Sequence, residues 1–356
     1  MPDASPEPAR DARQGGRRRE NPVAVEVVRG GTVESRHRAA CIVADARGRI
    51  AHRWGEADRF VLPRSAIKPI QALPLIETGA AERFSLSDAE IALACASHGG
   101  EPAHVAAVEA WLARLDLSEA DLECGAHPPV HDASAEALWR AGKAPSQLHN
   151  NCSGKHAAML TTARHLGEPT AGYVDRDHPV QRRVAQTIAE MAGVDVARAP
   201  VAVDGCSVPT IGLPLAGLAT AMARLADPGA LADARAEACA RICAAMAAHP
   251  DMVAGSGRFG TALIAASGGA ALAKTGAEGV YAVALPALGL GLALKVDDGA
   301  ARAAEVAMAA VLRHLGAIDD ALAARLADFI AKPLINCADR RVGEVRAAAS
   351  WPPASA

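Results

Sequence analysis

Aromatic side chains are scarce in this sequence: only 3% of its 356 residues are Phe, Trp or Tyr, although 51% are hydrophobic. The apolar content is mainly Ala, Val, Leu and Ile, so we expect a core that packs through small and branched side chains. Alanine-rich stretches also favour helices. A chain of this length can bury a substantial core, as one large domain or as two closely packed ones.

The sequence also lacks a large excess of either charge and any long apolar run. The formal net charge is −3, which gives no reason to expect a nucleic-acid partner. No window of about 18 residues is both apolar and uncharged, so we expect no membrane-spanning helix. The first 21 residues lack the apolar stretch of a secretory signal. We therefore expect a cytoplasmic protein whose partner is a small molecule rather than a nucleic acid or a membrane.

The eight cysteines are scattered along the chain, at positions 41, 95, 124, 152, 206, 239, 243 and 337. Thiols in the cytoplasm stay reduced, so we expect free cysteines rather than a disulfide framework. Most of them should behave as small buried hydrophobic residues.

Strand patterns occur near both ends of the chain and helical patterns fill its middle. The predicted strands are 23–28, 38–44, 49–54, 270–274, 280–285, 291–296 and a final edge strand at 335–345. The predicted helices are 65–78 with a kink at Pro74, 102–115, 134–141, 155–166, 179–192, 213–225, 230–248 and 299–315. Ser87 and Glu90 predict a capping box at the start of one more helix.

This order of elements predicts an α+β protein. We expect an antiparallel sheet built from N- and C-terminal segments, with a helical subdomain inserted between them. Residues 1–21 should form a disordered polar tail, and residues 22–356 a single catalytic unit. Within that unit, 22–64 and 256–356 should contain the sheet, and 65–255 should be mainly helical.

Ser65 and Lys68 form the first candidate for reactive chemistry. If Ser65 stands at a helix start, Lys68 lies on the same face one turn later. A hydroxyl is a weak nucleophile, and a lysine whose pKa is lowered by burial can act as its base. A helix cap beside a surface lysine is the plain alternative for so short a pattern.

Lys274-Thr275-Gly276 follows a predicted strand late in the chain and strengthens the first candidate. An early Ser-x-x-Lys with a late Lys-Thr-Gly is the motif layout of serine β-lactamases and penicillin-binding proteins. Ser97, in a Ser-His-Gly-Gly segment, is a further candidate hydroxyl. Its alternative is an exposed polar cap of a glycine-terminated helix.

Two polar turns with one cysteine each form another candidate site. Cys152 precedes Lys155 and His156, and Cys206 lies in an Asp-Gly-Cys-Ser turn around Asp204. Two thiolates with an amine or imidazole can bind a soft metal such as Zn²⁺, but the spacing matches no standard zinc motif. A structural thiol pair or a disulfide is the alternative. A later Gly-Ser-Gly loop ends in Arg258, which could bind a carboxylate or belong to a plain connection.

The sequence resembles the rhizobial-type L-asparaginases, also called the asparaginase II or class 3 family. These proteins are similar in fold to serine β-lactamases and glutaminases. The matching segments run from about residue 30 to 315 and contain all the motifs above. They are 34–38, 63–69, 95–98, 149–156, 203–209, 254–259 and 274–280. The extra N-terminal tail, a variant at 126–129 and Thr275 in place of a small residue are departures from the family pattern.

The resemblance implies hydrolysis of L-asparagine to L-aspartate and ammonia through an acyl-enzyme. It implies catalytic roles for two serine–lysine pairs, Ser65 with Lys68 and Ser97 with Lys274. Arg64, His156 and Asp204 match residues that line the substrate pocket. The remaining implied residues are the ligands of a Zn²⁺ ion near the serines: Cys152, Lys155 and Cys206.

No cofactor is expected to be required for the chemistry itself, and a homodimer is the family expectation. The rival enzymatic readings are a glutaminase and a β-lactamase-like or penicillin-binding hydrolase. An amino-acid-binding module that kept the pocket is the non-enzymatic alternative.

Overall fold

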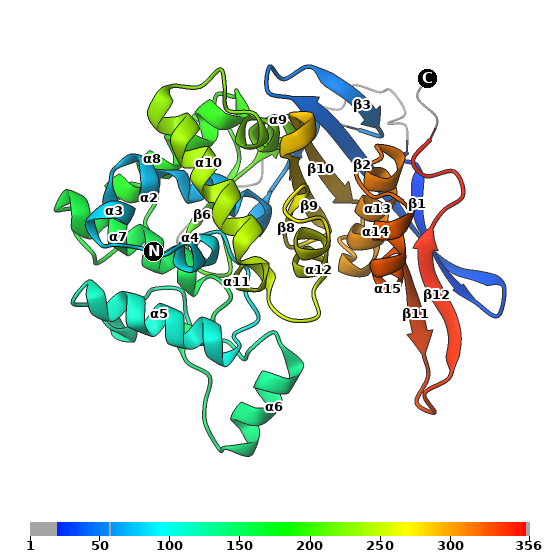
Figure 1. Ribbon diagram of the computed structural model, residues 1–356, viewed down its shortest axis with the longest axis horizontal. Helices are drawn as coiled ribbons and strands as arrows, with labels where there is room; N and C mark the ends of the chain where they lie inside the picture. The colour runs from blue at the N-terminus through cyan, green and yellow to red at the C-terminus, as the bar shows by residue number, and fades with distance from the viewer. Residues whose placement is uncertain (1–19, 57, 354–356) are drawn as a thin grey trace, which may run out of the picture.

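The computed structural model describes residues 20–56 and 58–353. Strands from both ends of the chain form an eight-stranded antiparallel sheet in the order β11–β12–β1–β2–β10–β9–β8, with β3 beside β2 (Figure 1). Their bounds are β1 (Val23–Arg29), β2 (Thr32–Asp45), β3 (Ile50–Trp54), β8 (Leu272–Thr275), β9 (Val280–Leu285), β10 (Leu290–Val296), β11 (Ala331–Ile335) and β12 (Arg341–Ala347). This arrangement confirms the predicted α+β fold with a sheet assembled from distant segments.

The long strand β2 holds the two halves of the sheet together. Its first half pairs with β1, and its second half, from Ala39 to Asp45, pairs with β10. The buried residues of β2 gather in this second half, where Ala39 to Ala44 are all inaccessible to solvent. The strand therefore carries the N-terminal segment into the middle of the sheet, beside strands from the end of the chain.

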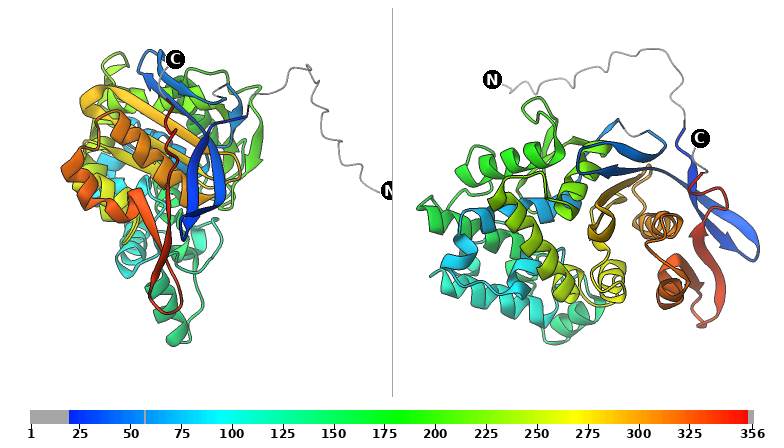
Figure 2. Two further views of the ribbon diagram at one scale, coloured as in Figure 1. Left: turned by 90° about the vertical axis from the view of Figure 1, so that its right-hand side faces the viewer. Right: turned by 45° about the horizontal axis from the view of Figure 1, so that its top comes forward.

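Helices fill the middle of the sequence and gather on one side of the sheet (Figures 1 and 2). They are α1 (Lys68–Gln71), α2 (Leu73–Glu77), α3 (Ala80–Arg83), α4 (Asp88–Ala94), α5 (Pro102–Arg114), α6 (Asp132–Arg140), α7 (Ser153–Leu166), α8 (Pro179–Ala192), α9 (Leu215–Ala226), α10 (Asp233–Ala248), α11 (Pro250–Ala254) and α12 (Phe259–Ala266). Two short ribbons lie among them: β4 (Phe60–Val61) with β7 (Leu213–Pro214), and β5 (Val201–Val203) with β6 (Pro209–Ile211). Helices α13 (Ala301–His314), α14 (Asp320–Arg325) and α15 (Ala327–Ile330) follow the strand β10.

Helix α9 packs directly on β10. A Cβ atom built at Gly291 would lie 2.1 Å from the backbone nitrogen of Ala223 and 2.2 Å from the carbonyl oxygen of Ala219. Only glycine permits this approach of helix and strand backbones. The buried hydrophobic residues form one cluster that extends from Ala24 to Trp351, mostly through Ala, Val, Leu and Ile. The expected core of small and branched side chains is thus observed.

Local structure differs from the predictions at several points. The expected helix 65–78 divides into a 3₁₀ turn, α1 and α2, because Pro69 and Pro74 each stand in a first helical turn and lack the N–H that a continuous helix needs. Beyond its first residue, which ends β11, the predicted edge strand 335–345 is confirmed only at 341–345, which belong to β12, and β12 pairs with both β1 and β11 and so does not lie at the edge. That segment contains a turn between β11 and β12, in which the Asn336 side chain accepts the N–H groups of Ala338 and Arg340.

The Ser87–Glu90 capping box is confirmed. The predicted disordered tail lies mostly outside the described residues, but its last member, Asn21, is buried and donates to Asp297 Oδ1 at 2.8 Å. The division of residues 22–356 into sheet-containing and helical parts of one catalytic unit stays a prediction.

Candidate active site

The segment that carries Ser65 begins at a strained backbone position. The 3₁₀ turn η1 (Arg64–Ile67) follows Pro63 and runs directly into α1. Arg64 has a φ of 51°, in the left-handed region that residues other than glycine rarely adopt. Its Nε lies 2.6 Å from Asp204 Oδ1. This ion pair helps to hold the backbone that presents Ser65 in its unfavourable conformation.

Ser97 lies between the two lysines that the sequence paired with different serines. Lys274 Nζ is 2.7 Å from Ser97 Oγ, and Lys68 Nζ is 3.0 Å from the same oxygen. Lys68 also donates to the carbonyl oxygens of Ala96 and Asn151. Within the described part of the chain, the Ser65 hydroxyl has no hydrogen bond. The amines and Ser97 therefore form a chain, Lys68–Ser97–Lys274, rather than two separate serine–lysine pairs.

Both lysine side chains are almost fully buried, with 1% of each residue exposed. Desolvation, together with the positive charge of Lys68, lowers the pKa of Lys274 well below its ordinary value. Lys274 therefore loses its proton at a lower pH than an exposed lysine would.

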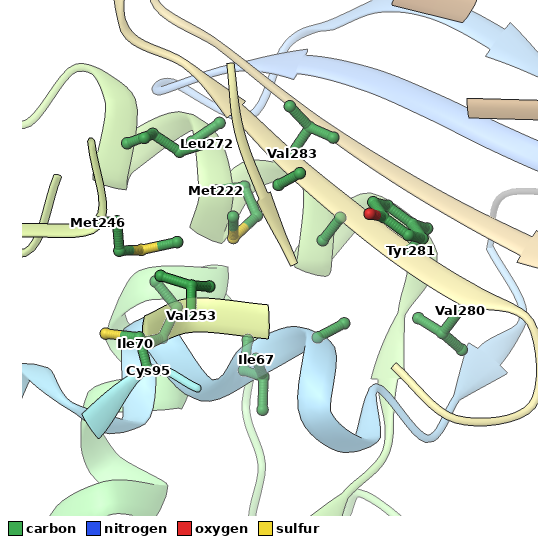
Figure 3. Packing of buried hydrophobic residues seen from close by; sticks show 14 of the residues in the cluster. Ile67, Ile70, Cys95, Met222, Met246, Val253, Leu272, Val280, Tyr281 and Val283 are labelled. Carbon is green, nitrogen blue, oxygen red and sulfur yellow. The ribbon is translucent and has the colours of Figure 1, made fainter. Parts of the chain in front are cut away.

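Apolar neighbours fix these polar residues in place. The side chains of Ile67, Cys95 and Val253 lie in one hydrophobic cluster beneath β9 (Figure 3). Ile67 lies next to Lys68 in sequence, and Cys95 lies two residues before Ser97. Ser97 also donates its N–H to the carbonyl oxygen of Val253 at 2.9 Å. The core thus determines where the reactive side chains point.

Hydrogen bonds of His98 stabilise the segment that follows Ser97. Its Nδ1 accepts the N–H of Gly100 at 3.1 Å, so its Nε2 donates to Ser153 Oγ at 2.9 Å. Ser153 in turn donates to the carbonyl oxygen of Leu148. Burial, with the charges of neighbouring residues, lowers the pKa of His98 well below its ordinary value. The ring is therefore a neutral structural support for Ser97.

Ser65 and Ser97 both line a cavity of about 310 Å³. Neither Lys68 nor Lys274 is part of its wall, but Ser97, which both amines contact, is. The other polar or charged lining residues are Arg64, His127, Asn150, Asn151, Asp204, Arg258 and Thr275. The structure thus places the two candidate serines at one cavity large enough for a small amide.

Two of the three predicted substrate-binding residues lie on this cavity. Arg64 and Asp204 are part of its wall. His156 is fully buried outside it, and its Nδ1 lies 2.7 Å from the Tyr173 hydroxyl. Successive residues on α7 project about 100° apart, so His156 cannot follow its neighbour Lys155 toward the same region. The structure gives no support to a substrate contact by His156.

The three predicted metal ligands come together beside the cavity. Cys152 and Cys206 are free thiols that line it, and Lys155 Nζ lies 3.0 Å from Cys206 Sγ. A hydrogen bond from Cys206, aided by the charges of Lys68 and Lys155, lowers the pKa of Cys152 well below its ordinary value despite burial. The same contact, with burial, raises the pKa of Cys206. Cys152 is therefore the thiol of this pair that ionises more readily.

The zinc prediction is not supported by the described residues and stays a prediction. Among residues 20–56 and 58–353, no group of three or more His, Cys, Asp or Glu side chains could hold a metal ion. Two sulfurs and one amine remain as a donor set. A tetrahedral zinc ion spaces such atoms roughly 3.5 Å apart, close to the 3.0 Å between Lys155 Nζ and Cys206 Sγ. The donors fit an ion only if Lys155 gives up its proton. Burial favours that loss, but the charges of Cys206 and Cys152 outweigh it and raise the pKa of the amine overall.

Three parts of the cavity wall were missed by the sequence reasoning: His127, Val130 and Ala301. His127 accepts the N–H of Asn151 at 3.0 Å and so braces the segment that contacts Lys68. The sequence contained only a weak signal, a histidine before two prolines. Ala301 begins α13, and nothing local in its alanine-rich surroundings indicates a site.

Comparison with solved structures finds distant likenesses. A crystal structure of Mglu in its native form matches with a TM-score of 0.45 and 15% identity over 78% of this chain, which spans 64% of the Mglu chain. Mglu in its tris and glutamate form gives a TM-score of 0.46 and 15% identity, over 83% of this chain and 63% of that one. A β-lactamase (Mb2281c) from Mycobacterium bovis gives 0.39 and 16%, over 82% of this chain and 95% of that one. No curated protein matches.

The described residues contain no helix that is both long enough and apolar enough to cross a membrane. The family model described as L-asparaginase II matches residues 25–347. This match covers most of the chain, including every candidate catalytic residue, and it confirms the resemblance that the sequence motifs indicated. The chain belongs to the L-asparaginase II family, a family of asparaginase-type amidohydrolases.

Proposed function

We propose that the protein hydrolyses the side-chain amide of L-asparagine to L-aspartate and ammonia through an acyl-enzyme on a serine. The observation that carries the proposal is the Ser97 hydroxyl, which contacts two buried lysine amines at a cavity that Ser65 also lines. An unassisted hydroxyl attacks amides poorly, and a free-base amine supplies the assistance. Family membership supports asparagine as the substrate.

In the proposed reaction Ser65 attacks the amide carbonyl carbon and Lys68 accepts its proton. Ser97 connects Lys68 to Lys274, so a proton can move along this chain to the leaving amide nitrogen. Backbone N–H groups near the start of η1 stabilise the oxyanion. Ammonia leaves, water hydrolyses the aspartyl ester, and the serine is regenerated.

A second assignment makes Ser97 the nucleophile and Lys274 its base. Their contact, at 2.7 Å, is shorter than the one between Ser97 and Lys68. The two assignments place the aspartyl ester on different serines. Peptide mapping of the trapped intermediate therefore distinguishes them.

The proposed function predicts the order in which substrates are hydrolysed. Wild-type protein is expected to release ammonia with a higher kcat/KM from asparagine than from glutamine, and to leave a chromogenic β-lactam intact. One methylene separates the two amides and is worth about 1–3 kcal/mol of discrimination. Ammonia release and β-lactam absorbance, measured side by side, test this order. Faster hydrolysis of glutamine or of the β-lactam would select a rival enzyme, and asparagine binding without ammonia release would indicate a binding module.

We also propose that Cys152, Lys155 and Cys206 hold a zinc ion beside the cavity. When bound, the ion supplies a fixed positive charge and ties the Cys152 and Cys206 turns together. This role is one of substrate orientation, because the serine and lysine groups carry the proposed chemistry without it.

Removal of zinc with a chelator is expected to raise the KM for asparagine more than it lowers kcat, because it removes orientation rather than the nucleophile. Metal content and both kinetic constants are measured before and after chelation. Zinc added back should restore the original KM. An unchanged KM in protein that has demonstrably lost its zinc would contradict this role.

Three further proposals accompany this function: a homodimer, a cytoplasmic location and a single catalytic unit at residues 22–356. The homodimer has its support in the family resemblance, and the cytoplasmic location in the sequence alone. The third is supported by the single cluster of buried hydrophobic residues that includes both sheet and helices.

A further inference from the structure

Arg258 is a charged group on the cavity wall that the proposed mechanism does not use. Arg64 is paired with Asp204, and the amines of Lys68 and Lys274 share Ser97. Within the part of the chain that the structure describes, the Arg258 guanidinium has neither a hydrogen bond nor an ion pair. An arginine that lines a cavity with all its donors unused can bind an anion there.

The loop before Arg258 is firmly tied down. Both carboxylate oxygens of Glu101 are occupied by Ser256, whose N–H donates at 2.8 Å and whose hydroxyl donates at 2.7 Å. Gly255 has a φ of 93°, and a Cβ atom there would lie 2.5 Å from Glu101 Oε1. The loop backbone is therefore held at the cavity, and the start of α12 at Phe259 fixes its other end.

Two acidic groups near the cavity are committed to partners other than Arg258. Glu101 is committed to Ser256, and Asp204 is committed to Arg64 and to the N–H of Gly205. Desolvation and the charge of Lys68 lower the pKa of Lys274 most, and the charge of Arg258 lowers it further. The guanidinium thus lies near the reactive chain. The charge of Glu305 also interacts with Arg258, but within the described residues no ion pair or hydrogen bond joins the two side chains, so the guanidinium donors stay available.

We propose that Arg258 binds the α-carboxylate of the amino-acid substrate and thereby selects α-amino acid amides over simple amides. The proposal rests on the proposed function. A planar guanidinium can donate two parallel hydrogen bonds to a carboxylate, which fixes orientation as well as position. This places the side-chain amide, at the other end of the substrate, toward the serines.

The test combines variants with substrates that do or do not carry a carboxylate. Asparagine is compared with 3-aminopropanamide, which has the same amide and amine but no α-carboxylate. Arg258→Met is expected to lower kcat/KM for asparagine by about 10–100-fold, mainly through KM, and to leave that for 3-aminopropanamide within about twofold. Arg258→Lys should retain part of the preference, because an ammonium keeps the charge but not the paired donors.

Arg325→Met is the matched control. Arg325 donates to the carbonyl oxygen of Ala266, at the opposite end of α12 from Arg258. Its loss perturbs the same helix without touching the cavity, so both substrates should be hydrolysed as by wild type. Thermal unfolding of each variant checks that the fold is retained.

A binding measurement makes the test independent of turnover. L-Aspartate and β-alanine, which lacks the α-carboxylate, are titrated calorimetrically into Ser65→Ala protein with and without Arg258→Met. Loss of aspartate affinity alone supports the proposal. Equal losses for both ligands, equal losses of kcat/KM for both amides, or unchanged aspartate binding would overturn it. Failure of the wild type to release ammonia from asparagine would instead refute the proposed function.

Discussion

Replacing Ser65 with alanine is expected to lower kcat for asparagine by at least about 10³-fold and to leave Tm within about 2 °C of wild type. The hydroxyl lines the cavity but forms no hydrogen bond within the described residues. Its removal therefore leaves no buried partner unsatisfied. Ammonia release and thermal unfolding followed by circular dichroism measure the two effects. Near-normal turnover would refute the role of Ser65.

Ser97→Ala is the informative comparison, because this serine has partners that Ser65 lacks. Its loss leaves the buried amines of Lys68 and Lys274 facing each other without the hydroxyl they share. The free energy of unfolding should fall by about 1–3 kcal/mol, and turnover should fall as well. Loss of activity with loss of stability at Ser97, against loss of activity alone at Ser65, would show that Ser97 holds the buried amines and Ser65 does not. Which serine attacks the amide is identified by the aspartyl adduct.

Acid-quenched wild-type protein should carry an added aspartyl group, which mass spectrometry of its peptides can locate. An adduct on the peptide that contains Ser65 supports the first assignment of the nucleophile. An adduct on the peptide that contains Ser97 supports the second. The experiment also reports whether an acyl-enzyme forms at all, since direct attack by water would leave both peptides unmodified.

Motif order together with the family resemblance chose residues that do meet at the site, with His156 as the exception. Ser65, Ser97 and Lys274 are far apart in sequence, and the structure brings all three to one place. The way they are connected could not be derived from spacing. Lys68 lies three residues from Ser65, yet its amine contacts Ser97, because the carbonyl oxygens of Ala96 and Asn151 attract it in that direction.

Backbone conformation accounts for other differences between sequence and structure. An arginine is a poor candidate for a left-handed position, so nothing in the sequence indicates that Arg64 adopts one. The tertiary ion pair with Asp204 makes it possible. The turn at 336–340 does have a sequence signal: Asn336 and Asp339 are residues that favour turns, and Asp339 has a φ of 54°.

Replacing Lys274 with methionine is expected to lower kcat/KM for asparagine by about 10²–10⁴-fold, the usual contribution of a positioned proton-transfer group. Methionine fills a similar volume but cannot exchange a proton with Ser97. Lys332→Met, on the exposed side of β11, is the matched control and should keep full activity. Initial rates of ammonia release for the three proteins test the prediction, and wild-type activity in Lys274→Met would contradict it.

The same substitution should stabilise the protein at neutral pH. Burial lowers the pKa of Lys274 well below the value of 10.5 that an unfolded chain restores. Between these two pKa values the unfolded state binds more protons than the folded state, so wild-type stability rises with pH in that window. At pH values below the folded-state pKa, wild-type protein bears the full free-energy cost of burying the protonated amine. Above pH 10.5 the amine is neutral in both states and this cost vanishes. Methionine carries no such cost.

Urea unfolding at several pH values between 7 and 10 measures this difference, with roughly unit steps sufficient to follow it. Lys274→Met should be more stable than wild type at the lower end, and the gap should narrow as pH rises. Loss of the contacts to Ser97 and Thr275 works against the variant equally at each pH. The decisive quantity is therefore the slope of the free energy of unfolding against pH. Parallel curves for variant and wild type would mean that folding does not change the pKa of Lys274. Lys274 would then not be the free-base amine that the proposed proton transfer needs.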